Sequence, residues 1–207
     1  MKKRNIAKFL RMLRKEGGEI SSFSSSSLIS EHPVVSSSSS ANMNSLCKKS
    51  IVKIQKRLKY KFNDRIWLEQ ALTRRSFVLE SISTQVDEQA NQRLEFIGDR
   101  VLELAVARIL FVKNSGDNEG ELNTKLKYCV NNTTLATIAT RLRLGKYLIV
   151  GKGEEMCGIR ENQKVLADTL EAIIGAIYFD SNEDMKRVCK FVARHFKTYL
   201  KQILASN

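Results

Sequence analysis

The feature that most constrains the fold is residues 92–111, an almost unbroken apolar stretch with the periodicity of a helix. Two carboxylates, Glu95 and Asp99, stand four positions apart in it, so a helix would place them one above the other with Cβ atoms about 6 Å apart. Arg93 and Arg100 are expected to project elsewhere on the helix and to leave this pair without full neutralisation. Acids in such apolar surroundings indicate a functional site more often than acids on a solvated face do.

A second acidic pair, Asp168 and Glu171, lies in the apolar segment 165–179. Two helices that each bury most of their surface should pack together, and with the acidic faces turned inward four carboxylates converge. Such a cluster cannot stay ionised in a partly desolvated site unless cations hold it. Gly98, in the middle of the first helix, indicates close approach by another backbone or side chain, because glycine costs roughly 1 kcal/mol there relative to alanine. A solvated acidic face is the common alternative, but the pattern favours a divalent-metal site.

Composition is compatible with one domain and a tail. The 207 residues are 43% hydrophobic and carry a net charge of +13. A basic chain that concentrates acids in one place suits a polyanionic partner, although charge that merely keeps a protein soluble is the simpler alternative. The cysteines form no C-x-x-C unit and, with two histidines, no zinc spacing, so reduced thiols inside a cell are expected. No apolar run reaches membrane-spanning length without a charge, which predicts a protein with no membrane partner.

Residues 1–49 are basic and rich in serine, and they are expected to be mostly disordered. The first 15 residues place apolar side chains on one helical face among basic ones, a pattern typical of an organelle transit peptide. Glu16, Glu19 and Glu31 count against that interpretation, so a disordered tail with nonspecific attraction for a polyanion is favoured. Nucleus or cytoplasm is the expected compartment, with the mitochondrion as the minority alternative.

Residues 50–207 are predicted to form one all-α domain. No segment alternates with period two for long enough to make a sheet, and the single strand-like stretch, residues 145–155, is flanked by glycines and is equally compatible with an extended loop. A polar loop is expected over residues 80–91. Helices beside the 92–111 segment are expected over residues 51–60, 64–79, 121–128, 133–142, 162–180 and 183–204.

Three motifs carry a resemblance to a known family: RLEFIGDRVLEL at 93–104, EGELNTKLKYCVNNTTLA at 119–136 and VLADTLEAIIGAIYFD at 165–180. In order and spacing they are similar to the catalytic domain of ribonuclease III. The similarity runs from about Ile54 to Leu200 and includes FNDRIWLEQALTRRS near its start. The resemblance implies a helical endonuclease domain.

The resemblance also implies a catalytic metal site, because Glu95, Asp99, Asp168 and Glu171 match the family's acids one for one. Glu171 is expected to be the central, bridging ligand, with Glu95 and Asp168 beside it and Asp99 acting through water or by holding a neighbour. The expected ion is Mg²⁺, with Mn²⁺ as a substitute, since hard cations take oxygen ligands. Divalent cations could both make a nucleophile from water and relieve charge on the leaving oxygen of a phosphodiester.

Other candidate positions lie outside the four acids, and two of them depart from the family's pattern. Gln92 stands where bacterial members often carry glutamate, so it cannot be a charged ligand but can hydrogen-bond to RNA. Arg74 replaces the histidine of the family's T-H-R-S pattern, so no role of that histidine is assigned to it. Glu103 is expected to form a salt bridge. Four further candidates remain. Glu119 is an acid at the border of the site, and Asn132 is expected to orient a ligand. Lys164 is either a phosphate contact or an ordinary surface lysine, and Arg75 belongs to the T-H-R-S pattern.

By resemblance the chain is expected to act as a homodimer whose two sites cut opposite strands of double-stranded RNA, leaving 5′-phosphate and 3′-hydroxyl ends. Phe96 matches an aromatic that inserts into the partner subunit; a core phenylalanine is the alternative. Only 27 residues follow Asp180, so the usual C-terminal double-stranded-RNA-binding domain is expected to be absent, with the basic tail or a separate RNA-binding partner protein compensating.

The rival function is that of a catalytically inactive ribonuclease III-like protein that binds structured RNA, for example in a mitochondrial ribosome. An inactive copy has no reason to keep all four acids at the correct spacing, so the enzyme is favoured. A helical scaffold with no RNA role would require the motif match to be accidental.

Overall fold

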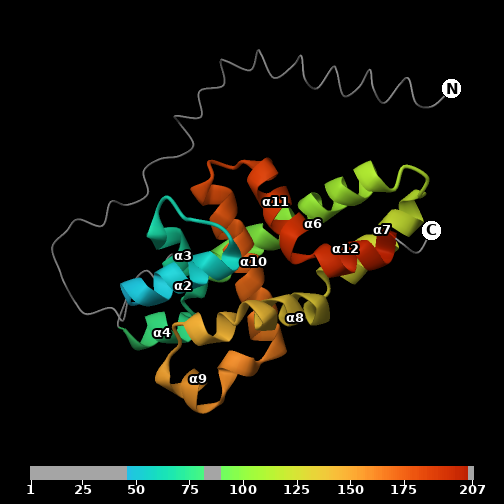
Figure 1. The fold of residues 1–207 in the computed structure, drawn as a ribbon. Coiled ribbons are helices and arrows are strands. Elements are labelled where there is room, and N and C mark those ends of the chain that lie inside the picture. The colour runs from blue at the N-terminus through green and yellow to red at the C-terminus, as the bar shows by residue number, and fades with distance from the viewer. Residues whose placement is uncertain (1–45, 82–89, 205–207) are drawn as a thin grey trace. The chain divides into compact units, whose positions relative to one another are not determined.

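Two long helices form the centre of the domain. The computed structural model describes residues 46–81 and 90–204. Within them α6 (Gln92–Lys113) packs along α10 (Gln163–Asp180), and α10 also contacts α8 (Asn132–Leu142) and α3 (Arg65–Leu72). Helix α10 is buried on nearly every face, so it is the element around which the other helices pack (Figure 1).

The prediction of an all-α fold is confirmed for the described residues, where the only β pairing is an isolated bridge between Thr73 and Ile149. The remaining α-helices surround α6 and α10, with two short 3₁₀ turns between them. They are α2 (Lys48–Leu58), α4 (Arg75–Glu80), α7 (Glu119–Val130), α9 (Lys152–Met156), α11 (Met185–His195), α12 (Lys197–Leu204), η3 (Leu144–Tyr147) and η4 (Ile159–Glu161). The expected tail and most of the expected 80–91 loop lie outside the described residues.

Two predicted helices are each divided in the structure. The 64–79 segment breaks at Thr73, whose extended backbone (φ −92°, ψ 117°) accepts a hydrogen bond from the backbone N–H of Asn91 at 2.9 Å. The 183–204 segment breaks at Phe196, between α11 and α12. Within the strand-like 145–155 stretch, Ile149 forms the bridge to Thr73 while the rest forms a 3₁₀ turn, extended backbone and the start of α9.

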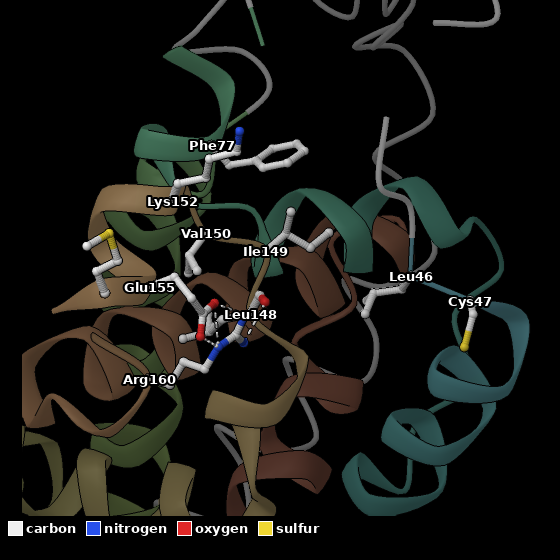
Figure 2. A pocket seen from close by; sticks show the side chains of 10 residues that line it. Leu46, Cys47, Phe77, Leu148, Ile149, Val150, Lys152, Glu155 and Arg160 are labelled. Carbon is white, nitrogen blue, oxygen red and sulfur yellow. Dashed lines mark hydrogen bonds and ion pairs between the residues drawn. The ribbon is translucent and has the colours of Figure 1, made fainter. Parts of the chain in front are cut away.

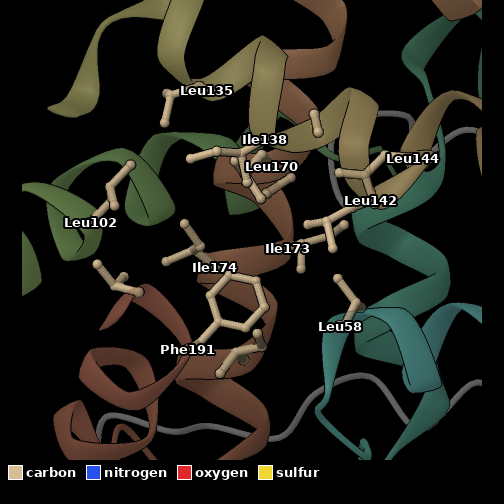
Figure 3. Close-up of a cluster of buried hydrophobic side chains, with 14 of the residues drawn as sticks. Leu58, Leu102, Leu135, Ile138, Leu142, Leu144, Leu170, Ile173, Ile174 and Phe191 are labelled. Carbon is tan, nitrogen blue, oxygen red and sulfur yellow. The ribbon is translucent and has the colours of Figure 1, made fainter. Parts of the chain in front are cut away.

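Leucine and isoleucine side chains fill the space between α10 and the helices around it (Figure 3). Leu170 and Ile173 on α10, Leu102 on α6 and Ile138 on α8 are fully excluded from solvent. Burying a side chain of this size contributes roughly 1.5–3 kcal/mol. The contacts of α10 therefore fix its position against α6, and with it the position of the acids that both helices carry.

Polar side chains fix where α10 begins and ends. Asn162 caps its first turn by accepting a hydrogen bond from the backbone N–H of Val165 at 3.2 Å. At the other end, buried Asp180 accepts hydrogen bonds from the Tyr60 hydroxyl at 2.7 Å and from the backbone N–H groups of Asn63 and Asp64 at 2.9 Å each. These contacts tie the turn before α3 to the end of α10.

Within the described part of the chain, none of the helices combines the length and the apolar character that crossing a membrane requires. The four cysteines are free thiols.

Candidate metal centre

The backbones of α6 and α10 touch at a pair of glycines. A Cβ atom at Gly98 would lie 1.9 Å from the Glu171 carbonyl oxygen, and one at Gly175 would lie 2.3 Å from the Leu94 carbonyl oxygen. Any other residue at either position would therefore overlap the opposite backbone. This confirms the expectation that Gly98 marks a close approach, and it explains how acids on two separate helices come together.

Three of the four predicted metal ligands meet beside this crossing. One carboxylate oxygen each from Glu95, Asp168 and Glu171 lies within 4.8 Å of the other two. Asp168 is buried, with 8% of its surface exposed, while Glu95 and Glu171 are half-buried. The two helices thus supply three oxygen donors to one small region.

The fourth acid, Asp99, lies next to this trio but has a partner of its own. Arg100 donates a hydrogen bond from Nη1 to Asp99 Oδ2 at 2.6 Å, and the same nitrogen lies 3.8 Å from Glu103 Oε2. The expectation that Arg100 projects away from the acids was wrong, because its long side chain folds back over the preceding residue. The expected salt bridge of Glu103 is present, with Arg100 as its partner.

The carboxyl group of Glu171 has the most perturbed pKa of the cluster. Burial raises it most, and the negative charges of Asp99, Asp168 and Glu95 raise it further, to about 8. The pKa of Glu95 is also raised, by burial first and then by the charge of Asp168. A carboxyl group that keeps its proton near neutral pH does not have enough positive charge around it to stabilise its ionised form.

Lys164, one turn before Asp168 on α10, is a cation in direct contact with the trio. Its Nζ donates hydrogen bonds to both Asp168 carboxylate oxygens at 3.1 Å each. The positive charge of Arg74 partly offsets the rise in the pKa of Glu95. The Arg74 guanidinium itself donates hydrogen bonds to Glu154, at 3.3 Å from Nε and 2.9 Å from Nη2.

The donor set fits a divalent cation. All three groups offer carboxylate oxygen, which Mg²⁺ and Mn²⁺ prefer, and no thiol or imidazole belongs to the trio. The raised pKa of Glu171 indicates that one ammonium does not balance the charge of these acids. The residues that would hold the ion are Glu95, Asp168 and Glu171, with Asp99 beside them.

The other predicted residues do not belong to the trio. Gln92, Arg75, Asn132 and Glu119 are the first residues of α6, α4, α8 and α7, and all four are exposed. Asn131, rather than Asn132, caps α8 by accepting a hydrogen bond from the Thr134 N–H at 2.8 Å. The roles assigned to these four residues stay predictions.

Phe96 is 68% exposed, so it is not a core residue in the single chain. It shares the outer face of α6 with Leu104 and Phe111, which are 57% and 70% exposed. Residues 96, 104 and 111 follow one another at two-turn intervals, and this spacing keeps them on one side of the helix. We call these three residues the α6 apolar face.

A polar network beside the cluster was not predicted from the sequence. Ser76 donates to Glu154 Oε2 at 2.6 Å and accepts from the Gly151 N–H at 3.0 Å, and Glu154 binds Arg74. The hydrogen bonds from Arg74 and Ser76 hold the pKa of the Glu154 carboxyl below its usual value, and they join α4 to α9. The sequence showed Glu154 in the 145–155 stretch and Ser76 in the T-H-R-S-like pattern. It gave no sign that these two residues, about 75 positions apart, contact each other.

A hollow of the described surface lies elsewhere, between α4, residues 148–150 and α9 (Figure 2). Its volume is about 620 Å³ and its lining is mostly apolar, with Phe77 and Ile149 among the residues that face it. Arg160 closes one side through an ion pair with Glu155 at 2.6 Å and a hydrogen bond to the Leu148 carbonyl oxygen at 2.8 Å. None of the clustered acids lines this hollow, so it is not the site of their chemistry.

Comparison with known proteins identifies similar chains. The family described as Ribonuclease-III-like matches residues 64–199. The chain is 41% identical over 148 residues to Ribonuclease 3 of Syntrophobacter fumaroxidans, covering 72% of this chain and 60% of that protein. It is 38% identical over 155 residues to Ribonuclease 3 of Fusobacterium nucleatum, covering 75% of this chain and 64% of that protein. The chain therefore spans about three fifths of the length of these relatives.

Solved structures show the same similarity. The nuclease domain of ribonuclease III from Campylobacter jejuni superimposes with a TM-score of 0.65 at 35% identity, over 73% of this chain and 99% of that one. The description of that structure places a region involved in dimer formation in the nuclease domain. Dicer from Pichia stipitis superimposes with a TM-score of 0.52 at 26% identity, over 70% of this chain and 60% of that one.

Proposed function

The chain belongs to the ribonuclease III family, and on that premise we propose that it is a divalent-metal-dependent endoribonuclease that hydrolyses double-stranded RNA as a homodimer. The proposal includes products with 5′-phosphate and 3′-hydroxyl ends. The observation that carries it is the trio of Glu95, Asp168 and Glu171, whose oxygens lie within 4.8 Å of one another although the residues come from two helices.

The roles proposed for the acids follow from their surroundings. Bound divalent cations would supply a nucleophile from water at neutral pH and offset charge on the phosphate. Glu171, beside the glycine crossing and surrounded by the other acids, is the central ligand, and it must lose its proton to hold an ion. Glu95 and Asp168 complete the ligand set. Asp99, held by Arg100, acts through its charge on Glu171 rather than as a direct ligand.

Homodimer formation is proposed from the α6 apolar face. A helix with large apolar side chains on its exposed side leaves surface that a partner can cover, and a second copy presents the same face.

Helix α6 has 22 residues and is about 33 Å long, so within one subunit Glu119 lies at the far end of α6 from Glu95. An antiparallel pairing of two α6 helices would bring the partner subunit's Glu119 toward the cluster, which is how it could border a site.

RNA recognition is proposed to depend on charge. The net charge of +13 favours a polyanion, and A-form duplexes are recognised through phosphates and 2′-hydroxyls across the minor groove. Binding should therefore weaken steeply as salt is raised.

The test is cleavage of a perfect RNA duplex in Mg²⁺ by the wild-type chain, Glu171→Gln and Glu103→Gln. Glu103 is the matched control, since it lies on α6 one turn beyond Asp99 and outside the trio. We expect the wild type and Glu103→Gln to cut the duplex, Glu171→Gln not to cut, and none of them to cut single-stranded RNA or duplex DNA. Duplex binding by the wild type without any cleavage would support the inactive RNA-binding alternative instead.

A further inference from the structure

The ammonium of Lys164 occupies the oxygens of a buried ligand. Lys164 and Asp168 are one turn apart on α10, and Nζ contacts both Asp168 oxygens at 3.1 Å. The Asp168 side chain is 12% exposed, whereas that of Lys164 is 71% exposed. A solvent-facing side chain thus places its charged end on an acid that faces the interior of the site.

The contact with Asp168 also matters for the other two acids of the trio. The Asp168 carboxylate is one of the three groups whose oxygens lie within 4.8 Å of one another, and Lys164 is also a cation that lowers the pKa of Glu95 and Glu171. An ion held by all three residues needs at least one Asp168 oxygen that the ammonium now contacts. The ammonium and a divalent cation therefore cannot both keep full contact with Asp168.

We propose that Lys164 is a tethered counterion, which holds Asp168 until a divalent cation displaces it and so raises the metal concentration that the site requires. This inference rests on the proposed function, because it assumes that the trio binds a divalent cation. Displacement needs no change in the fold, since the Lys164 side chain is mostly in solvent and its flexible stem can withdraw. The released ammonium then stays at the rim, within reach of a phosphate.

If the contact had a different role, removing Lys164 would change the metal affinity in the opposite direction. If Lys164 organised the acids for the metal, its removal would weaken metal binding. If it is a counterion, its removal relieves repulsion between the ammonium and the incoming ion, and metal binding becomes tighter. Metal affinity in the absence of RNA therefore distinguishes the two roles without any measurement of cleavage.

The experiment is calorimetric titration of Mg²⁺ into the full chain at low ionic strength and at about pH 9.5. This pH is well above the Glu171 pKa of about 8 and below the raised pKa of Lys164, so the acid is ionised before metal is added and the ammonium keeps its charge. Lys164→Met removes the charge and Lys164→Arg keeps it. Lys190→Met removes one charge from an exposed position on α11, a helix that carries none of the clustered acids. We expect Lys164→Met to bind Mg²⁺ about three- to tenfold more tightly than the wild type does. Lys164→Arg and Lys190→Met should bind Mg²⁺ with the affinity of the wild type.

The failures can be told apart. Equal or weaker Mg²⁺ binding by Lys164→Met, with wild-type binding intact, overturns the counterion role and leaves the metal centre standing. An equal gain in Lys190→Met would overturn it as well, because net charge would then be the cause. Absence of Mg²⁺ binding by both the wild type and Lys164→Met would overturn the metal centre together with the role of Lys164.

Discussion

Replacing Gly98 with alanine tests whether the helix crossing builds the site. The new Cβ would lie 1.9 Å from the Glu171 carbonyl oxygen, about 1.5 Å short of an ordinary contact, and it would lie 2.9 Å from the backbone nitrogen of Gly175. Because both obstacles are backbone atoms, the helices themselves must separate by on the order of 1 Å. That shift moves Glu95 away from Asp168 and Glu171.

The energy terms of this change have opposite signs. Alanine is better than glycine in a helix interior by about 1 kcal/mol, while forcing an extra methyl into a packed interior costs about 1–3 kcal/mol. We expect Gly98→Ala to lose at most about 2 kcal/mol of unfolding free energy and to remain folded. The effect on function should be larger, because a misplacement of about 1 Å at a catalytic site can reduce rate by about 100-fold.

The assay compares urea unfolding, Mg²⁺ affinity and duplex cleavage for the wild type, Gly98→Ala and Gly153→Ala. Gly153 is the matched control, since it is an exposed helical glycine whose added Cβ would meet nothing within 4 Å. We expect Gly98→Ala to bind Mg²⁺ at least about tenfold more weakly and to cleave about 100-fold more slowly, with Gly153→Ala unchanged. A folded Gly98→Ala with wild-type metal affinity and rate would refute the idea that the glycine crossing positions the acids.

Three further predictions follow from other parts of the structure. Because the pKa of Glu171 is raised in the folded state, the metal-free protein should lose stability as pH rises from about 5 to about 8, and urea unfolding of Glu171→Gln should show a smaller loss. Phe96→Ser combined with Phe111→Ser should shift the chain toward monomer in sedimentation equilibrium and leave its melting temperature within a few degrees of the wild type, since both side chains are exposed in the single subunit; a dimer of unchanged affinity would place the interface elsewhere. Asp180→Asn should lower the unfolding free energy by about 1–3 kcal/mol in urea titration, because the amide cannot accept all of the hydrogen bonds that the carboxylate receives, and an unchanged midpoint would contradict this.

The fold class and the longest helix were predictable because they follow from local pattern. Residues 92–111 have the composition of a buried helix, and α6 extends only two residues further. The breaks at Thr73 and Phe196 were not predictable, because a local pattern cannot show partners that are distant in sequence. The extended backbone of Thr73 is fixed by its bridge to Ile149 and by the hydrogen bond from Asn91.

The candidate site was predictable as a set of acids but not as an arrangement. Helical spacing alone treats Asp99 and Glu95 alike, and only the family resemblance set Asp99 apart from the ligands Glu95, Asp168 and Glu171. The structure gives Asp99 an arginine partner and places Glu95 in the trio. The contact between Arg100 and Asp99 was not predicted, because helical periodicity does not determine the direction of a long side chain. The link from Arg74 to Glu154 was missed for a related reason, since it joins two short helices that only the tertiary fold brings together.

The features that build the site also work against the stability of the metal-free domain. Gly98 and Gly175 each lower helix propensity, and burial, followed by repulsion from the neighbouring acids, raises the pKa of Glu171. Such conflicts between local preference and the folded state are expected where function rather than stability determines the residue. Replacing Glu171 with glutamine removes one charge without removing the crossing, so the variant should be more stable than the metal-free wild type at about pH 8 while losing the proposed activity. A loss of stability in that variant would mean that Glu171 makes a structural contribution larger than the repulsion it experiences.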